Sequence, residues 1–350
     1  MKLCTVIGAR PQFIKHAALE FQLSSEPDIE HIVIHTGQHF DANMSSSFFT
    51  EFNIKVPDYN LNIHSKKHGE QTAMMLGGIE KILLEIKPDF LIVYGDTNST
   101  LAGALAAKKL CIKVIHIEAG LRSFNMDMPE EVNRVLTDRI SNILFVPSNL
   151  AMTNLENEGL LNQSVLTGDI MKDMHSYAKL HNLIRSKNEV PYYYATIHRP
   201  YNTDNVERLN SIFDSLNNLD KRVIFSLHPR TKDRSVKMEI ELSSYSNIQF
   251  VDPVPYFQNL NFIYNAAALL TDSGGMQKEA YWLKTKCVTI RKETEWTETL
   301  KSGWNHLVFD NLGDTQNILD LEPGIHDDLL YGNGRTAAHI IQYLKESTTS

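Results

Sequence analysis

Short apolar runs recur along the first half of the chain, and turn residues close each of them. Six such runs precede the region around Thr167–Asp173: "LCTVIGARP", "HIVIHTGQ", "FLIVYGDTN", "KVIHIEAG", "ILFVPS" and "SVLTGD". Longer stretches separate most of the runs, and the clearest, Gly69–Lys87, carries apolar residues at helical spacing. Continuous apolar strands that alternate with helices are typical of a parallel sheet covered on both faces.

The second half of the chain repeats this pattern. Six strand-like runs follow Pro191: "YYYATIHRP", "VIFSLHP", "IQFVDPVP", "AALLTDSGG", "CVTIRKETE" and "HLVF". We therefore expect an α/β protein with two Rossmann-like, doubly wound domains, residues 1–170 and 171–335, facing a cleft. The polar segment Asp173–Val190 is expected to bridge them. The last helix-like stretch, Thr336–Glu346, could pack on either domain.

Composition narrows the class of protein further. The chain has 350 residues, of which 42% are hydrophobic and 22% charged, as is ordinary for a globular protein. The net charge of −8 argues against a nucleic-acid binder, which needs a basic excess. Three scattered cysteines indicate buried thiols in a reducing compartment, and no apolar run approaches membrane-spanning length. The start of the chain reads as a first strand, and a cytoplasmic location is predicted.

Polar residues follow most of the predicted strands, at the sheet edge where open α/β sheets bind ligands. In "GARPQFIK", Arg10 falls at the first strand–helix turn and Lys15 about one helical turn later. Two cations near a helix N-terminus suit a diphosphate, although a solvated Arg and Lys fit the spacing equally well. Gln38 and His39 follow the next strand, where a polar pair is more often structural than catalytic.

The acidic residues of the first half are the strongest chemical signal. Asp96 and Glu118 each end an apolar strand, and Glu130 begins a helix after a proline. Taken singly, Asp96 could cap the next helix and Glu130 could be an ordinary helix-start charge. Three acids that converge with Arg122 and Arg134 favour a site of proton transfer.

The second half supplies histidines and a glycine-rich turn. His198, Arg199 and His228 follow two of its strands, and no nearby Cys or carboxylate completes a metal-ligand set, so anion binding or acid–base work fits better. In "TDSGGMQKEA", Ser273, Gly274 and Gly275 lead from a strand into a helix, and Glu279 lies one turn further on the face of Gly275. This arrangement would place a phosphate on backbone N–H groups and a ribose diol on Glu279, although a plain turn has the same spacing.

Together these motifs resemble the non-hydrolysing UDP-N-acetylglucosamine 2-epimerase family, over nearly the whole chain from Gly8 to about Val308. The motifs occur in the family's order: "GARPQFIK", "TGQH", "GDTNSTLAGALAA", "HIEAGLRS", "PEEVNR", "TGD", "HRP", "HP" and "TDSGG". The resemblance implies two Rossmann-like domains of the type found in GT-B glycosyltransferases. It also implies that the C-terminal helix, about residues 336–350, packs back on the first domain.

The resemblance further implies inversion at C2 of a UDP-2-acetamido sugar, through loss of UDP to a 2-acetamidoglucal and its return. Asp96, Glu118, Glu130 and His198 match the catalytic positions. Positions that bind nucleotide, diphosphate or substrate are matched by Arg10, Lys15, Gln38, His39, Arg122, Arg134, Arg199, His228, Ser273, Gly274, Gly275 and Glu279. No metal and no cofactor is implied, and a homodimer is expected.

Several positions depart from the best-known members of the family. Gln12 replaces an acid, Tyr201 stands near the place of a glutamate, and Trp296 takes the place of an arginine near the substrate. "GARPQ" and "TEW" look closer to the branch that epimerises UDP-2,3-diacetamido-2,3-dideoxyglucuronate. That sugar remains an alternative substrate. A hydrolysing epimerase, a GT-B glycosyltransferase and a non-catalytic sugar-nucleotide sensor are rival functions, and the sensor would have no need of three acids.

Overall fold

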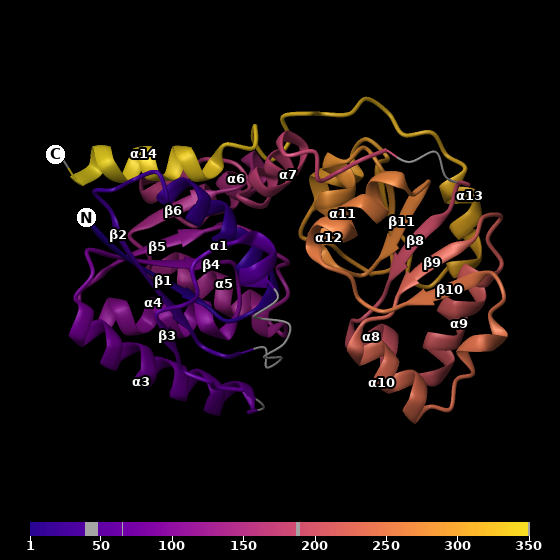
Figure 1. Ribbon diagram of the computed structural model, residues 1–350, viewed down its shortest axis with the longest axis horizontal. Helices are drawn as coiled ribbons and strands as arrows, with labels where there is room; N and C mark the ends of the chain where they lie inside the picture. Colours follow the sequence, from indigo (N-terminus) through magenta and orange to yellow (C-terminus); the bar gives the residue numbers. More distant parts are fainter. Residues whose placement is uncertain (39–47, 65, 187–189, 349–350) are drawn as a thin grey trace. The chain divides into compact units, whose positions relative to one another are not determined.

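The computed structural model describes the chain except for residues 39–47, 65, 187–189 and 349–350. The chain forms two compact units (Figure 1). Unit 1 comprises Met1–Tyr177 together with Leu329–Ser350, and unit 2 comprises Ala178–Asp328. Within the described part of the chain, no helix is both long enough and apolar enough to cross a membrane.

Unit 1 is built on a sheet of seven strands in the order β3-β2-β1-β4-β5-β6-β7, with every neighbouring pair parallel. The strands are β1 (Lys2–Ile7), β2 (Glu30–His35), β3 (Tyr59–Asn60), β4 (Phe90–Tyr94), β5 (Lys113–Ile117), β6 (Ile143–Val146) and β7 (Ser164–Leu166). The strand order reverses between β1 and β4. Doubly wound sheets bind their ligands at such a reversal, beyond the carboxyl ends of the strands.

Helices cover both faces of this sheet, because its central strands are apolar on both sides. The helices are α1 (Arg10–Leu23), α3 (His68–Ile86), α4 (Asn98–Lys109), α5 (Pro129–Ile140), α6 (Asn149–Asn157), α7 (Met171–Leu180) and α14 (Thr336–Thr348). α1 packs with α14, and α4 packs between α3 and α5 (Figure 1). A Cβ on Gly103 of α4 would come within 3.2 Å of Val6, so the absence of a side chain lets α4 lie close against β1.

The last helix, α14, belongs to unit 1. The carboxylate of Asp173 accepts hydrogen bonds from the backbone N–H groups of Thr336 (2.9 Å) and Ala337 (2.7 Å). Two donors that begin α14 are thereby satisfied, at a helix end that favours negative charge. At the other end, the ring of Tyr343 meets Phe145 of β6 edge-on, with 5.6 Å between the centroids.

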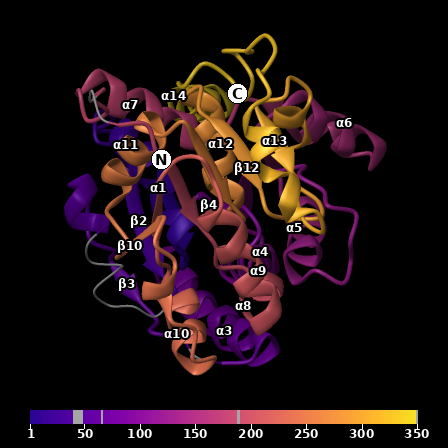
Figure 2. The same ribbon diagram turned by 90° about the vertical axis from the view of Figure 1, so that its right-hand side faces the viewer.

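Unit 2 repeats the same topology with six parallel strands in the order β10-β9-β8-β11-β12-β13. The strands are β8 (Tyr193–Thr196), β9 (Val223–Ser226), β10 (Ile248–Val251), β11 (Ala268–Thr271), β12 (Lys286–Thr289) and β13 (Asn305–Leu307). Its helices are α8 (Pro200–Thr203), α9 (Val206–Asn217), α10 (Pro229–Lys237), α11 (Tyr256–Asn265), α12 (Gly274–Trp282) and α13 (Thr315–Leu319). The order reverses between β8 and β11, and α12 packs beside β11 and β12 (Figure 2).

Alternating residues of β8 show how both faces of the second sheet are buried. Tyr193 packs into the core that contains α9 residues such as Phe213, whereas Tyr194 stacks on Phe262 of α11 with 5.1 Å between ring centroids. Both hydroxyls are satisfied, by Asp220 and Asn259 respectively. The prediction of an α/β protein with two Rossmann-like, doubly wound units is confirmed.

Candidate active site

The turns that follow β1 and β4 are joined at the switch point of unit 1. A Cβ on Gly8 would lie 2.1 Å from Oγ1 of Thr36, so only glycine fits there. Oε1 of Gln12 accepts hydrogen bonds from the N–H groups of Gly8 (2.8 Å) and Ala9 (3.1 Å), and Nε2 donates to the carbonyl of Tyr94 (3.0 Å). An amide can do both, whereas a carboxylate could only accept. Gln12 therefore joins the turn after β1 to the end of β4.

Lys15 and Glu118 form a buried ion pair at this switch point. Glu118 follows β5 with a positive φ of 71°, a backbone conformation that non-glycine residues rarely adopt. A Cβ on Gly95 would lie 3.0 Å from Oε2 of Glu118 and 3.1 Å from Nζ of Lys15. The glycine after β4 thus leaves room for the pair. Strained backbone of this kind is often found at functional sites.

Asp96 faces a second cation. Its Oδ2 lies 3.1 Å from Nη1 of Arg134, which comes from α5. Desolvation raises the pKa of Asp96, and the charges of Glu118 and Glu130 add to this, whereas Arg134 and Lys15 oppose it. The residue that caps α4 is Thr97, whose side chain accepts from the N–H of Thr100, so the helix-cap explanation of Asp96 is wrong. Asp96 is therefore a half-buried acid with a perturbed pKa, as catalytic acids and bases often are.

The two acids that begin α5 have different surroundings. Glu130 is half-buried, whereas Glu131 is 1% exposed. Glu131 accepts hydrogen bonds from the backbone N–H groups of Ser123 and Phe124, both at 2.9 Å, and pairs with Nε of Arg134 at 3.1 Å. Glu131 thus fastens the preceding loop to the helix, and Glu130 is the acid whose field reaches Asp96.

Arg122 is held in ion pairs within unit 1. Its guanidinium lies 2.8 Å from Oδ2 of Asp138 and 2.7 Å from Oε1 of Glu158. Asp138 also meets Nδ1 of His116 at 2.6 Å and is itself fully buried. A contact between Arg122 and the substrate stays a prediction. These ion pairs give the arginine a clear part in fixing the loop after β5.

The remaining predicted residues of unit 1 are Arg10, Gln38 and His39. Arg10 begins α1, and its guanidinium lies over the ring of Phe48 at 5.3 Å. Oε1 of Gln38 accepts hydrogen bonds from the N–H (3.0 Å) and the hydroxyl (2.6 Å) of Ser99, at the start of α4. His39 lies outside the described residues.

In unit 2, Asp272 organises the switch point between β8 and β11. It is fully buried and accepts hydrogen bonds from the N–H groups of His198 (3.0 Å) and Arg199 (2.8 Å). Its Oδ1 also lies 3.2 Å from Nδ1 of His198. A carboxylate in this position favours a proton on Nδ1 and leaves the lone pair of the neutral ring on Nε2. His198 is thereby oriented for acid–base work or for binding.

His228 stacks on His198, with 4.9 Å between the ring centroids. Nδ1 of His228 accepts a hydrogen bond from the N–H of Arg230 at 3.2 Å, in the first turn of α10. The neutral ring therefore carries its proton on Nε2, where it can donate. Arg199 is half-buried beside this pair.

The glycine-rich turn forms the start of α12, as its spacing predicts. Ser273 is the N-cap and makes no capping hydrogen bond with its side chain, and Gly274 and Gly275 are half-buried. The first N–H groups of a helix have no partner within it, which makes this end suited to an anion. Glu279 is 4% exposed and lies in the same helix.

Two residues beside this turn, Arg291 and Lys278, are not among the site residues that the sequence predicted. Arg291 is 5% exposed, and its Nη2 pairs with Oε2 of Glu295 at 3.0 Å. Its Nη1 makes no hydrogen bond with any described residue, and a Cβ on Gly274 would lie 3.8 Å from it. Lys278 is buried, with Nζ 3.6 Å from the ring centroid of Trp296. Arg291 directly follows the apolar run "CVTI", so the strand-end rule applied to the other strands would have found it.

Two doubly wound α/β units, each with charged groups gathered where its strand order reverses, define a two-domain enzyme of nucleotide-binding architecture. The family model of UDP-N-acetylglucosamine 2-epimerase matches residues 22–345. This chain belongs to the UDP-N-acetylglucosamine 2-epimerase family. It is accordingly a UDP-sugar 2-epimerase, an isomerase.

Similar proteins support this assignment over the full length. A UDP-N-acetylglucosamine 2-epimerase homolog of Methanococcus maripaludis is 46% identical, with 99% of each chain covered. The UDP-2,3-diacetamido-2,3-dideoxy-D-glucuronate 2-epimerase of Pseudomonas aeruginosa is 44% identical, with 98% of this chain and 99% of that protein covered. Both kinds of epimerase are thus similarly related to this chain.

Among solved structures, the Methanocaldococcus jannaschii UDP-GlcNAc 2-epimerase in complex with UDP-GlcNAc and UDP matches with a TM-score of 0.88 and 41% identity. The match covers 99% of this chain and 100% of that one. A lipopolysaccharide outer core galactosyltransferase, WaaB, matches with a TM-score of 0.55 at 12% identity, which shows the shared fold alone. The fold therefore occurs in both classes of enzyme, and the reaction must be argued from the site.

Proposed function

We propose that this enzyme inverts C2 of a UDP-2-acetamido sugar without hydrolysing it, and that it interconverts UDP-N-acetylglucosamine and UDP-N-acetylmannosamine. The observation that carries the proposal is the grouping of Asp96 and Glu118 with two cations, Arg134 and Lys15, at the switch point of unit 1. Transfer of a proton from C2 needs such carboxyl groups. Binding UDP alone would favour cations without them.

The proposed reaction has two halves. A carboxylate takes the proton from C2, the C–H electron pair forms the C1–C2 double bond, and the C1–O bond breaks on the opposite face to release UDP. The 2-acetamidoglucal then accepts a proton at C2 on the other face, and a UDP oxygen re-forms the bond to C1. No atoms are gained or lost overall. Because the C2 proton is poorly acidic, stabilising the departing diphosphate supplies much of the rate.

We assign the proton transfers to the acids of unit 1, supported by the raised pKa of Asp96. The proposed catalytic residues are Asp96, Glu118, Glu130 and His198. Residues proposed to bind the nucleotide, the diphosphate or the sugar are Arg10, Lys15, Gln38, His39, Arg134, Arg199, His228, Ser273, Gly274, Gly275 and Glu279. Arg122 is also proposed to bind the substrate, and its ion pairs support a second part in positioning the loop after Glu118.

Arg291 is a further proposed diphosphate ligand. A buried guanidinium with an unbonded Nη1 next to a helix N-terminus combines two features that favour a phosphate. Glu279, in the same helix, is proposed to bind the ribose hydroxyls, since a carboxylate would repel the phosphates.

UDP-2,3-diacetamido-2,3-dideoxyglucuronate is the second candidate substrate. The 44% identity with the Pseudomonas aeruginosa enzyme favours it, together with Gln12 and Trp296 in place of the residues of the best-known members. The chemistry at C2 would be the same for both sugars. A homodimer as the working state and the cytoplasm as its location remain predictions.

Nuclear magnetic resonance in D2O tests these proposals directly. The enzyme is incubated separately with UDP-GlcNAc and with the diacetamido-glucuronate nucleotide. Deuterium at C2 with the UDP linkage retained is expected for the true substrate. Release of free sugar would show a hydrolysing epimerase instead. Transfer of the sugar to an added acceptor without C2 exchange would indicate a glycosyltransferase, and no exchange in either nucleotide would refute the proposed function.

A further inference from the structure

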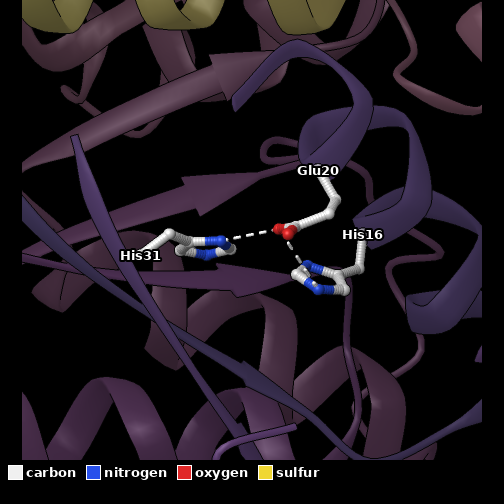
Figure 3. A group of neighbouring side chains, drawn as sticks. All are labelled: His16, Glu20 and His31. Atoms are coloured by element: carbon white, nitrogen blue, oxygen red, sulfur yellow. Dashed lines mark hydrogen bonds and ion pairs between the residues drawn. The ribbon is translucent and has the colours of Figure 1, made fainter. Parts of the chain in front are cut away.

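A second group of chemically active side chains lies in unit 1, away from the strand ends. His16 and Glu20 are one turn apart on α1, and His31 stands near the start of β2 (Figure 3). One ligand atom from each of the three residues lies within 4.8 Å of the other two. None of the proposed steps at C2 uses these residues.

The separations approach those around a bound transition metal. Oε2 of Glu20 lies 2.7 Å from Nδ1 of His31 and 4.0 Å from Nε2 of His16. Nitrogen and oxygen ligands bind Zn²⁺ at about 2.0–2.2 Å, so two ligands of one ion are at most about 4.4 Å apart. Small side-chain rotations would therefore bring all three atoms around one ion. The ion would replace the proton that now joins Glu20 to His31.

The outer nitrogen of each histidine ring faces a hydroxyl. Nε2 of His31 lies 2.8 Å from Oγ1 of Thr5, and Nδ1 of His16 lies 3.5 Å from the hydroxyl of Tyr94. Metal-binding histidines generally donate their other N–H to a polar neighbour, which fixes the ring and its tautomer. Protons on these outer nitrogens leave the lone pairs on the two nitrogens that face Glu20 (Figure 3).

His16 supplies the most specific observation. Its ring is completely buried, and Nε2 makes no hydrogen bond with any described residue. A buried polar atom without a hydrogen bond is costly, and a neutral imidazole is the form that binds metals. An ion between the rings would remove that cost.

The charge around the cluster also suits a cation. Glu20 places a carboxylate oxygen within hydrogen-bond distance of His31, so the cluster offers one acidic ligand beside two imidazoles. Lys55 is paired with Asp58 at 2.6 Å, so its positive charge is offset by a carboxylate of its own. Glu20 is 15% and His31 is 7% exposed, so an ion can approach from their side.

We propose that His16, Glu20 and His31 form a binding site for one divalent transition metal ion of the Zn²⁺ class. Two imidazoles and one carboxylate favour Zn²⁺, Co²⁺ or Ni²⁺ over Mg²⁺ and Ca²⁺, which prefer oxygen ligands. A water molecule would complete the coordination from the partly exposed side. The ion would tie α1 to β2 and would stabilise unit 1 without entering the reaction.

Titration of the full-length, chelator-treated enzyme tests the site. Calorimetry with ZnCl2 is expected to show one ion per chain and a rise in the unfolding temperature. Co²⁺ should give visible absorption bands of a tetrahedral or five-coordinate site. Mg²⁺ should give neither result. Failure of the unaltered chain to bind Zn²⁺ or Co²⁺ in a one-to-one ratio would overturn the proposal.

Substitutions of the proposed ligands test whether the ion binds at this cluster. Glu20→Gln keeps the size of the side chain and is expected to weaken Zn²⁺ binding more than about 100-fold, beyond the loss typical of outer-shell changes. His339→Gln, at an exposed histidine of the same unit, is the matched control and should bind normally. Unfolding measured in the chelator shows whether Glu20→Gln is folded, and His31→Asn provides a second variant. Unchanged binding in folded variants would place the ion elsewhere.

Discussion

The two units share one topology but equip their switch points with different chemistry. In unit 1, carboxylates meet side-chain cations: Lys15 pairs with Glu118, and Arg134 with Asp96. In unit 2, the buried Asp272 binds backbone N–H groups and orients His198, and a helix begins at Gly274. The first arrangement leaves titratable acids at the strand ends. In the second arrangement, the carboxylate of Asp272 holds the turn after β8 in place.

This difference indicates how one scaffold divides the work of a reaction. Acids with perturbed pKa values are suited to moving protons, and a helix N-terminus with a buried arginine is suited to holding a phosphate. Changes in unit 1 should therefore impair chemistry more than nucleotide binding, and changes in unit 2 should do the reverse.

Asp96→Asn and Glu118→Gln should have the largest effect. Loss of one positioned acid or base typically lowers a rate about 10²–10⁴-fold, so deuterium exchange at C2 should fall by that factor. UDP affinity, measured by calorimetry, should survive. Glu156→Gln, at an exposed acid of the same unit, is a control expected to keep full exchange. If UDP affinity falls in step with exchange, these residues bind the nucleotide and do not transfer protons.

Asp138→Asn should produce the largest loss of stability. Breaking a buried charge pair costs about 3–5 kcal/mol, because Arg122 and His116 lose their partner. Although burial raises the pKa of Asp138, His116 and Arg122 outweigh it and lower the pKa overall. The stabilisation is therefore complete above the ordinary carboxyl pKa and is lost as pH falls through the lower folded value.

Thermal unfolding across the acid range checks this prediction. The unaltered chain should lose the stabilisation from Asp138 at low pH, and the variant should show less of that loss. Asp233→Asn, which removes an exposed pair with Lys237, should change the unfolding temperature little. Equal acid sensitivity of the Asp138 variant and the unaltered chain would contradict the assignment.

Arg291→Gln should weaken UDP binding about 10–100-fold, the loss expected for a charge-assisted hydrogen bond. Arg291→Lys should recover part of the affinity because it keeps the charge. The matched control is Arg234→Gln, at a partly exposed arginine of unit 2 that pairs with Asp204. If Arg291→Gln leaves the UDP affinity unchanged, Arg291 does not bind the diphosphate.

Gly95→Ala should have the smallest effect. The residue has a φ of 60°, and forcing alanine into the left-handed region costs about 1–2 kcal/mol. Its Cβ would also press on the pair formed by Lys15 and Glu118. Exchange at C2 should fall modestly while UDP affinity changes little. A variant that matches the unaltered enzyme in exchange rate would show that this ion pair tolerates displacement.

The strand ends were predictable because apolar runs and turn residues are local signals. Glu118, Asp272 and Arg291 follow directly after such runs, and Asp96 follows one residue after another. The same rule could not show which of the two acids at the start of α5 pairs with Arg134. Helical spacing allows Arg134 to pair with Glu130 or with Glu131, and packing selects Glu131, which also binds the preceding loop.

The sequence by itself determined two doubly wound units and the positions of their charged turns, since periodicity and turn chemistry act over a few residues. Only the tertiary structure decided which charges pair. Arg122 meets Asp138 and Glu158, and His31 meets Glu20 across the space between β2 and α1. Such partners are distant in the chain and are selected by the free energy of packing and desolvation, which no short stretch of sequence contains.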